Sequence, residues 1–267
     1  MVLKVYKRLK GKIGNLIKFL IIYIKYSNKL KRLKNIHNGE RCFIIGNGPS
    51  LRMEDLDKLK NEYTFAANKI YIAFEDTAWR PTYYCVQDSK IINNELETLT
   101  KKVEAKIKFI AGNFLVFKNI FLYNWIYFCR GKGRFFSQKP KFSENIQRLI
   151  YPGYTVTYTN IQLAVYMGFN EIYLLGVDHN YSVVENLDGT IAKTDIKNHF
   201  SDKYDGKNNW YDLIINKQVN IPRIEEMTLT YQAAKEYADA HGIKIYNATR
   251  GGKLEVFDRF DFDSLFN

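Results

Sequence analysis

The stretch Arg41-Cys42-Phe43-Ile44-Ile45-Gly46-Asn47-Gly48-Pro49-Ser50 decides the fold of this chain. A short apolar run that ends in a Gly-rich turn is typical of a buried strand. We expect a helix over residues 51–59, with Ser50 as its N-cap. The two glycines permit close backbone approach, and the N–H groups of a helix N-terminus can bind a phosphate. The stretch therefore predicts a nucleotide-binding strand–loop–helix unit, with a plain tight turn as the alternative.

Strands and helices alternate in the rest of the chain. Such alternation predicts an α/β fold, with a Rossmann-like, mostly parallel sheet and helices on both faces. The expected strands are residues 63–67, 82–86, 107–111, 125–129, 171–176 and 243–246, and the expected helices are 159–167 and 225–240. Residues 179–222 show no clear period and are too long for a passive loop, so we interpret them as a lid. The predicted catalytic domain is 41–267.

Polar residues follow several of these strands. In open parallel sheets ligands bind beyond the carboxyl ends of the strands. These residues should therefore meet along that edge of the sheet, which we call the rim. The turn matches neither G-x-G-x-x-G nor a Walker loop, so those generic labels do not apply. The predicted nucleotide-binding residues are Gly46, Asn47, Gly48, Ser50, Asn68, Gln87, Asp88, Gly176 and Asp178.

The basic charge belongs to one arm, residues 1–36. The chain carries a net charge of +12, but residues 1–40 hold 11 Lys/Arg against one acid, and the remainder holds 29 against 27. The nearly neutral body argues against a nucleic-acid partner. Three cysteines without a CxxC pair and without a preceding secretory signal fit buried thiols in a reduced, cytoplasmic compartment.

The arm has the pattern of a basic amphipathic helix. One face carries Ile13, Leu16, Ile17, Leu20, Tyr23 and Ile24, and the opposite face carries Lys18, Lys25, Lys29 and Arg32. The longest uncharged run, residues 19–24, is far shorter than the roughly 20 residues of a bilayer span. We expect the arm to bind an anionic membrane, peripherally at the inner face of the cell membrane. Packing on its own domain or in a homo-oligomer is the alternative.

Four blocks of the sequence resemble the MptE-like family, named after an archaeal 6-hydroxymethylpterin diphosphokinase, many of whose bacterial members are associated with surface-glycan assembly. They are "FIIGNGPSL" (43–51), "FAANKIY" (65–71), "TVTYTNIQLAVYMGFNEIYLLGVDHNY" (155–181) and "YNATRGGKLEVF" (246–257). The first block and the strand at 171–176 also resemble the bacterial sialyltransferases of glycosyltransferase family 42. The resemblance spans about residues 41–260.

The resemblance to those sialyltransferases implies roles for particular residues. Asn47 would contact the CMP part of the donor, Asn68 would bind the phosphate region or the ribose of the donor, and Asp178 would lie at the nucleotide. His199 would be the general base on the acceptor hydroxyl, with His179 as its competitor, and the lid tyrosines Tyr181, Tyr204 and Tyr211 would hydrogen-bond the departing phosphate.

Two departures from that pattern leave the donor sugar open. Asn180 stands where the family has a tyrosine. The Thr-Ser pair that handles the sugar carboxylate becomes Thr155-Val156-Thr157. Thr155, Thr157 and the cations Arg223 and Arg250 are the expected contacts to the donor sugar or its anionic groups.

These observations predict a glycosyltransferase that moves an acidic sugar from a CMP-nonulosonate-like donor to a cell-surface or lipid-linked glycan. We expect no metal or other cofactor, although Asp261-Phe262-Asp263 superficially matches an Asp-x-Asp signature. An ATP-dependent pyrophosphokinase, with Mg²⁺ on Asp88 and Asp178, is the first alternative. A non-catalytic nucleotide-binding partner in glycan assembly is the second.

Overall fold

The computed structural model describes residues 2–112, 122–131, 139–204, 214, 216 and 220–266, with side chains from residue 13 on except at 15, 18 and 19. Its centre is a parallel sheet in the order β10-β9-β6-β1-β2-β3-β4-β5. The strands are β1 (Arg41–Ile45), β2 (Thr64–Ala67), β3 (Tyr83–Val86), β4 (Ile107–Ala111), β5 (Trp125–Phe128), β6 (Glu171–Leu175), β9 (Lys244–Asn247) and β10 (Asp258–Arg259). The predicted α/β fold is confirmed.

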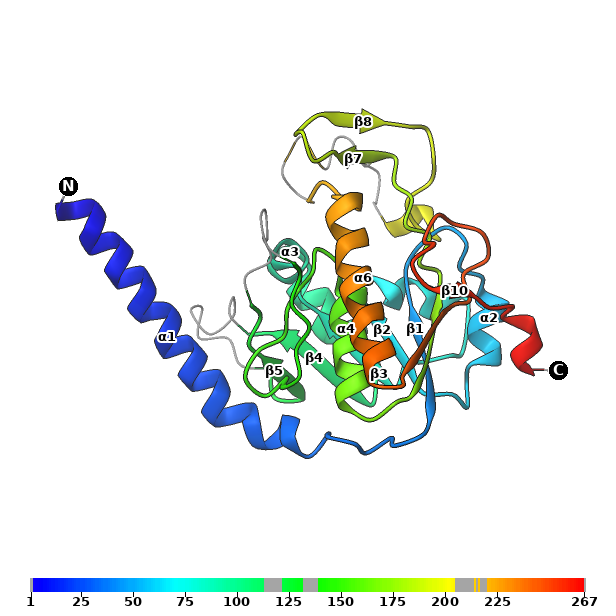
Figure 1. Cartoon of the computed structure of the whole chain (residues 1–267), viewed down its shortest axis with the longest axis horizontal. Helices are drawn as coiled ribbons and strands as arrows, with labels where there is room; N and C mark the ends of the chain where they lie inside the picture. Colours follow the sequence, from blue (N-terminus) through cyan, green and yellow to red (C-terminus); the bar gives the residue numbers. More distant parts are fainter. Residues whose placement is uncertain are drawn as a thin grey trace.

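Helices cover both faces of this sheet. They are α2 (Met53–Lys58), α3 (Ser89–Lys102), α4 (Val156–Tyr166) and α6 (Ile224–Ala240), with the 3₁₀ turn η1 (Ile70–Glu75) between β2 and β3. From β1 to β4 the chain steps across the sheet in one direction, and from β6 to β9 it steps in the other. Since such crossovers are right-handed, α2, η1 and α3 lie on one face and α6 on the other. Helix α4 packs beside α6 (Figure 1).

Two helix predictions differ from the structure. Helix α2 begins at Met53 with Arg52 in the N-cap position, so the prediction of Ser50 as N-cap is wrong. The hydroxyl of Ser50 instead donates to Asp178, a contact across 128 residues that local patterns do not reveal. Helix α3 was not expected, because its sequence SKIINNELETLTKK is mostly polar and only Ile92 and Leu99 are buried.

The segment predicted as a lid contains a small antiparallel hairpin, β7 (Val183–Glu185) and β8 (Ile191–Lys193), and a 3₁₀ turn, η3 (Asp202–Tyr204). The hairpin lies beyond the end of the main sheet, next to the first turn of α6 (Figure 1). Glu185 N–H donates to the carbonyl of Pro222 at 2.9 Å, which ties the hairpin to the approach to α6.

Helix α1 (Val2–Lys31) packs on β5 by the second half of its length, and its first half runs away from the body (Figure 1). The core contacts come from Ile22, Tyr26, Leu30 and Leu33, all under 9% exposed, and the Tyr26 ring stacks on Tyr127 with 4.7 Å between ring centroids. Apolar side chains on the opposite side of the helix are exposed: Ile13, Leu16, Ile17, Leu20, Ile21, Tyr23 and Ile24. No described helix is long and apolar enough to cross a membrane.

Candidate functional site

The loops after β1 and β6 meet at the point where the strand order reverses. Strands β1 and β6 pair directly, but the chain continues from β1 to β2 on one side and from β6 to β9 on the other. Ligands of open α/β sheets bind at such a switch point. The N–H of Gly48 donates to the carbonyl of Gly176 at 2.9 Å. A Cβ on Gly46 would lie 2.2 Å from that carbonyl oxygen, and one on Gly48 would lie 1.8 Å from Oδ2 of Asp178. These glycines allow the two loops to touch.

Asp178 contacts the turn at which the sequence predicts a phosphate. Its Oδ2 accepts hydrogen bonds from Oγ of Ser50 at 2.8 Å and from the N–H of Ser50 at 3.4 Å. Burial raises the pKa of Asp178 above its ordinary value, and the hydrogen bonds from Ser50 oppose that rise. The N–H groups of Gly48 and Ser50 thus already bind protein oxygens. An anion at the N–H groups that open α2, after Arg52, stays a prediction.

Asn47 and Asn68 lie at the carboxyl ends of β1 and β2. The side-chain amide of Asn47 donates to the carbonyl of Ala67 at 3.1 Å, which fixes its orientation. In both residues Oδ1 is buried without a hydrogen-bond partner among the described residues. Asn68 also has φ +55°, a left-handed conformation that Asn adopts more readily than most residues. Two acceptor oxygens, Oδ1 of Asn47 and of Asn68, thus lie at the ends of the adjacent strands β1 and β2.

Gln87 and Asp88, after β3, are bound within the protein. Gln87 donates to the carbonyl of Pro152 at 3.0 Å and accepts from the hydroxyl of Thr159 at 2.7 Å. Asp88 is the N-cap of α3 and accepts from the N–H of Lys90 at 2.7 Å and from Asn220 at 3.0 Å. Gln87 therefore connects the rim to α4, and Asp88 connects it to the end of the lid.

The predicted lid contacts the same rim at His199 and Tyr204. The N–H of Phe200 donates to the carbonyl of Asn47 at 3.0 Å, and Lys69 donates to the carbonyl of Tyr204 at 3.2 Å. The ring of His199 stacks on Tyr204 with 3.7 Å between centroids. Desolvation lowers the pKa of His199 to about 4, against a hydrogen bond to the Asn47 backbone that raises it. At neutral pH the imidazole is uncharged, the form that accepts a proton.

Three other predicted contacts of the phosphate and donor sugar, Tyr181, Thr155 and Thr157, gather around Tyr231. Tyr181 packs against the core, and burial raises its pKa above the usual range. Tyr211 lies outside the described residues. Thr155 is the N-cap of α4, and its hydroxyl accepts from the N–H of Thr157 at 3.3 Å. The hydroxyls of Thr155 and Thr157 both hydrogen-bond Tyr231.

The two predicted cations are engaged by carboxylates. Arg250 makes a bidentate pair with Asp55 at 2.9 and 3.0 Å and a further contact with Asp263 at 2.8 Å. Arg223 pairs with Glu226 at 3.0 Å. The prediction that Arg250 is a cation facing a ligand is contradicted, since the guanidinium fastens α2 to the last turn of the chain.

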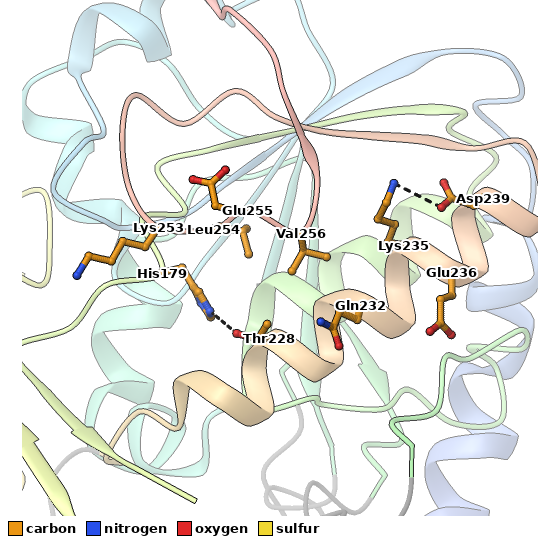
Figure 2. Close-up of a pocket in the computed structure, with 10 residues that line it drawn as sticks. All are labelled: His179, Thr228, Gln232, Lys235, Glu236, Asp239, Lys253, Leu254, Glu255 and Val256. Atoms are coloured by element: carbon orange, nitrogen blue, oxygen red, sulfur yellow. Dashed lines mark hydrogen bonds and ion pairs between the residues drawn. The ribbon is translucent and has the colours of Figure 1, made fainter.

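His179, the competing base, lines a cavity of about 560 Å³ between α6 and residues 253–256 (Figure 2). Its Nε2 is 2.8 Å from Oγ1 of Thr228, and that hydroxyl already donates its hydrogen to the carbonyl of Ile224. The ring therefore carries its proton on Nε2. Burial lowers the pKa of His179 to about 4, and its φ is +52°.

Sequence reasoning missed Asn160, on α4. It is 1% exposed, and neither polar atom of its side chain has a hydrogen-bond partner within the described part of the chain. The available signal was a carboxamide inside an otherwise buried helix, where an unpaired amide is costly.

A model of the 6-hydroxymethylpterin diphosphokinase MptE-like family matches residues 18–184, more than half of the chain. The chain belongs to this family. Comparison with curated proteins gives no match.

Solved glycosyltransferases resemble the structure. A Maf glycosyltransferase from Magnetospirillum magneticum AMB-1 matches with a TM-score of 0.51 and 15% identity, over 91% of this chain and 39% of the other. This chain thus spans well under half of that protein. The sialyltransferase CstII from Campylobacter jejuni, in complex with CMP-3FNeuAc, matches with a TM-score of 0.43 and 14% identity over 83% and 86% of the two chains. At these identities the first match establishes a shared fold.

Proposed function

We propose that this protein is a glycosyltransferase that moves an acidic sugar from a CMP-linked, sialic-acid-like donor to a glycan acceptor. One observation carries the proposal. The unpaired side-chain oxygens of Asn47 and Asn68 lie at adjacent strand ends, and the backbone of Asn47 is held by the lid segment that carries His199. A nucleotide-binding rim thus has a proton acceptor at its edge. The fold shared with a Maf glycosyltransferase agrees with this function.

The transfer needs a base and a stabilised leaving group. In this mechanism His199 takes the proton of the acceptor hydroxyl, the hydroxyl oxygen bonds to the anomeric carbon, and the bond from that carbon to the phosphate oxygen breaks. CMP leaves with the bonding electrons. A pKa of about 4 makes His199 a weak base in this state. The negative charge of a bound nucleotide would raise that pKa toward the operating pH.

Release of CMP from CMP-N-acetylneuraminate, with lactose as acceptor and with and without EDTA, tests the mechanism. We expect turnover in EDTA and its loss by at least a hundredfold in His199→Ala, the typical contribution of a general base. His179→Asn is the matched variant and should retain turnover. Complete loss of turnover in EDTA, or unchanged turnover in His199→Ala, contradicts the proposal, and loss only in His179→Asn transfers the base role to His179.

Family membership favours a second candidate, a diphosphokinase that uses ATP. That chemistry normally needs Mg²⁺ on carboxylates. Asp178 is bound to Ser50 and Asp88 to Lys90 and Asn220, and the described residues contain no group of three or more His, Cys, Asp or Glu suited to a metal. Because Mg²⁺ is usually held by one or two carboxylates together with substrate phosphates, Asp88 and Asp178 are the residues that would hold it, in exchange for some of these contacts. ATP consumption with 6-hydroxymethylpterin would support this candidate, and binding of a nucleotide without turnover of any donor would indicate a non-catalytic partner.

We further propose that α1 lies on an anionic membrane surface. Its exposed face carries seven apolar side chains between Ile13 and Ile24, on the side of the helix away from the core contacts of Ile22 and Tyr26. Lys25 and Lys29 lie on the other side of the helix, with their Nζ atoms 5.5 and 5.6 Å from the centroid of the Tyr26 ring. Their positive charges, with that of Arg32, would favour an anionic surface over a neutral one. This placement suits a lipid-linked acceptor at the inner leaflet.

Co-sedimentation with phosphatidylcholine vesicles, with and without 30% phosphatidylglycerol, tests this placement. Binding should require the anionic lipid and should fall in Ile17→Glu/Ile24→Glu. Leu229→Glu, an exposed leucine on α6, is the matched control and should bind normally. Equal binding by both variants contradicts the proposal. Conversion of an oligomer to a monomer by the α1 variant, without vesicle binding by wild type, would assign the face to subunit packing.

A further inference from the structure

Asn160 is a buried carboxamide that the described part of the protein leaves unsatisfied. The residue is 1% exposed, and both Nδ2 and Oδ1 are without a hydrogen-bond partner there. Its neighbour Gln162 shows what the same helix does with a structural amide. Gln162 accepts from the N–H groups of Ser143 and Tyr151 and donates to the carbonyls of Tyr151 and Tyr158. Asn160 thus does not have the contacts of a residue that holds the fold together.

The position of Asn160 is near the rim. Helix α4 packs on β1, β2 and β3, and it runs from the carboxyl edge of the sheet to the loop before β6 (Figure 1). Thr159, one residue earlier, donates to Oε1 of Gln87 directly after β3 at 2.7 Å. Asn160 therefore lies in the second turn of α4, close to the end of the helix that faces the rim.

The side-chain atoms without a hydrogen-bond partner at Asn47, Asn68 and Asn160 are mainly acceptors. They are Oδ1 of Asn47, Oδ1 of Asn68 and Oδ1 of Asn160, with Nδ2 of Asn160 as a donor. Three carbonyl oxygens disfavour a phosphate, whose oxygens are acceptors as well. They suit a group that presents O–H or N–H donors, such as ribose hydroxyls or the amino edge of a base.

We propose that Asn160, together with Asn47 and Asn68, binds the nucleoside part of the nucleotide and that the phosphate lies elsewhere on the rim. The inference rests on the proposed function, since it assigns a part of that donor to particular side chains. It makes Asn160 a specificity residue: its carboxamide both donates and accepts, so it can make a bidentate contact with the edge of a base.

Two measurements on Asn160→Leu and Gln162→Leu in the full chain test the proposal. The first is the melting temperature without ligand. Leucine at 160 removes a buried amide without partners and should raise Tm, whereas leucine at 162 removes four hydrogen bonds and should lower it. A Tm of Asn160→Leu below that of wild type, or failure of this variant to fold, overturns the proposal because the carboxamide then serves the fold.

The second measurement is calorimetric titration with CMP, UMP, GMP, AMP, cytidine and inorganic phosphate. We expect Asn160→Leu to weaken binding of the preferred nucleotide at least tenfold, to weaken its nucleoside by the same factor, and to leave phosphate binding unchanged. If wild type binds a nucleotide and Asn160→Leu binds it within twofold, this inference fails while the proposed function stands. If wild type binds none of the nucleotides, the proposed function fails with it.

Discussion

Substitution of His179 by Asn should flatten the pH dependence of stability. His179 is 6% exposed, and burial lowers its pKa from 6.5 to about 4. Between these values the unfolded chain binds more protons than the folded one, so stability falls as the pH falls. A difference of roughly 2.5 pKa units corresponds to about 3 kcal/mol at most, of which about 2 kcal/mol is lost between pH 7 and pH 5. Asn tolerates the positive φ of this position and does not titrate.

The assay is equilibrium urea unfolding at pH 7 and pH 5. The loss of unfolding free energy between the two pH values should be about 2 kcal/mol smaller in His179→Asn than in wild type. Gln232→Asn lines the same cavity without a titrating group and should behave as wild type. An unchanged difference in His179→Asn would refute the reasoning, since it would mean that His179 is solvated in the folded protein.

Three further outcomes follow from the contacts described above. Arg250→Met should lower the unfolding free energy by about 3–5 kcal/mol in urea, because it leaves Asp55, 4% exposed, without its partner; a change below 1 kcal/mol would contradict the buried pair. Gly46→Ala should abolish nucleotide binding in calorimetry and lower Tm, because its Cβ would lie 2.2 Å from the backbone oxygen of Gly176, and wild-type binding would contradict the close contact of the loops. His199→Gln should lose acceptor-dependent CMP release while retaining CMP affinity within threefold, and a parallel loss of affinity would show that His199 holds the nucleotide instead.

The central strands were predictable because a strand buried on both faces of the sheet has a continuous run of apolar residues. Residues 41–45 and 171–175 are runs of apolar side chains between polar or glycine-rich turns, and both are central strands. The convergence of Asn47, Asn68 and Asp178 followed from the parallel order alone. The family blocks also lie on these strands and their loops, which explains why the resemblance was visible at low identity.

What the sequence did not reveal depends on contacts between distant residues. Asp178 takes the amide and hydroxyl of Ser50, and the helix begins only at Met53, so the expected N-cap at that turn is wrong. Arg250 follows the last central strand as a ligand contact would, but Asp55, 195 residues away, binds it. The arm shows an apolar face at helical spacing, whereas the side chains that reach the core, Ile22 and Tyr26, lie on the other side of the helix.

A crystal structure of the protein with CMP would test the central claim most directly. The account predicts the nucleotide beyond the carboxyl ends of β1 and β2, with hydroxyl or amino groups of the nucleoside within hydrogen-bond distance of Asn47 and Asn68 and with His199 facing its phosphate end. CMP in the cavity beside His179 and α6, or no CMP at the rim at saturating concentration, would contradict it.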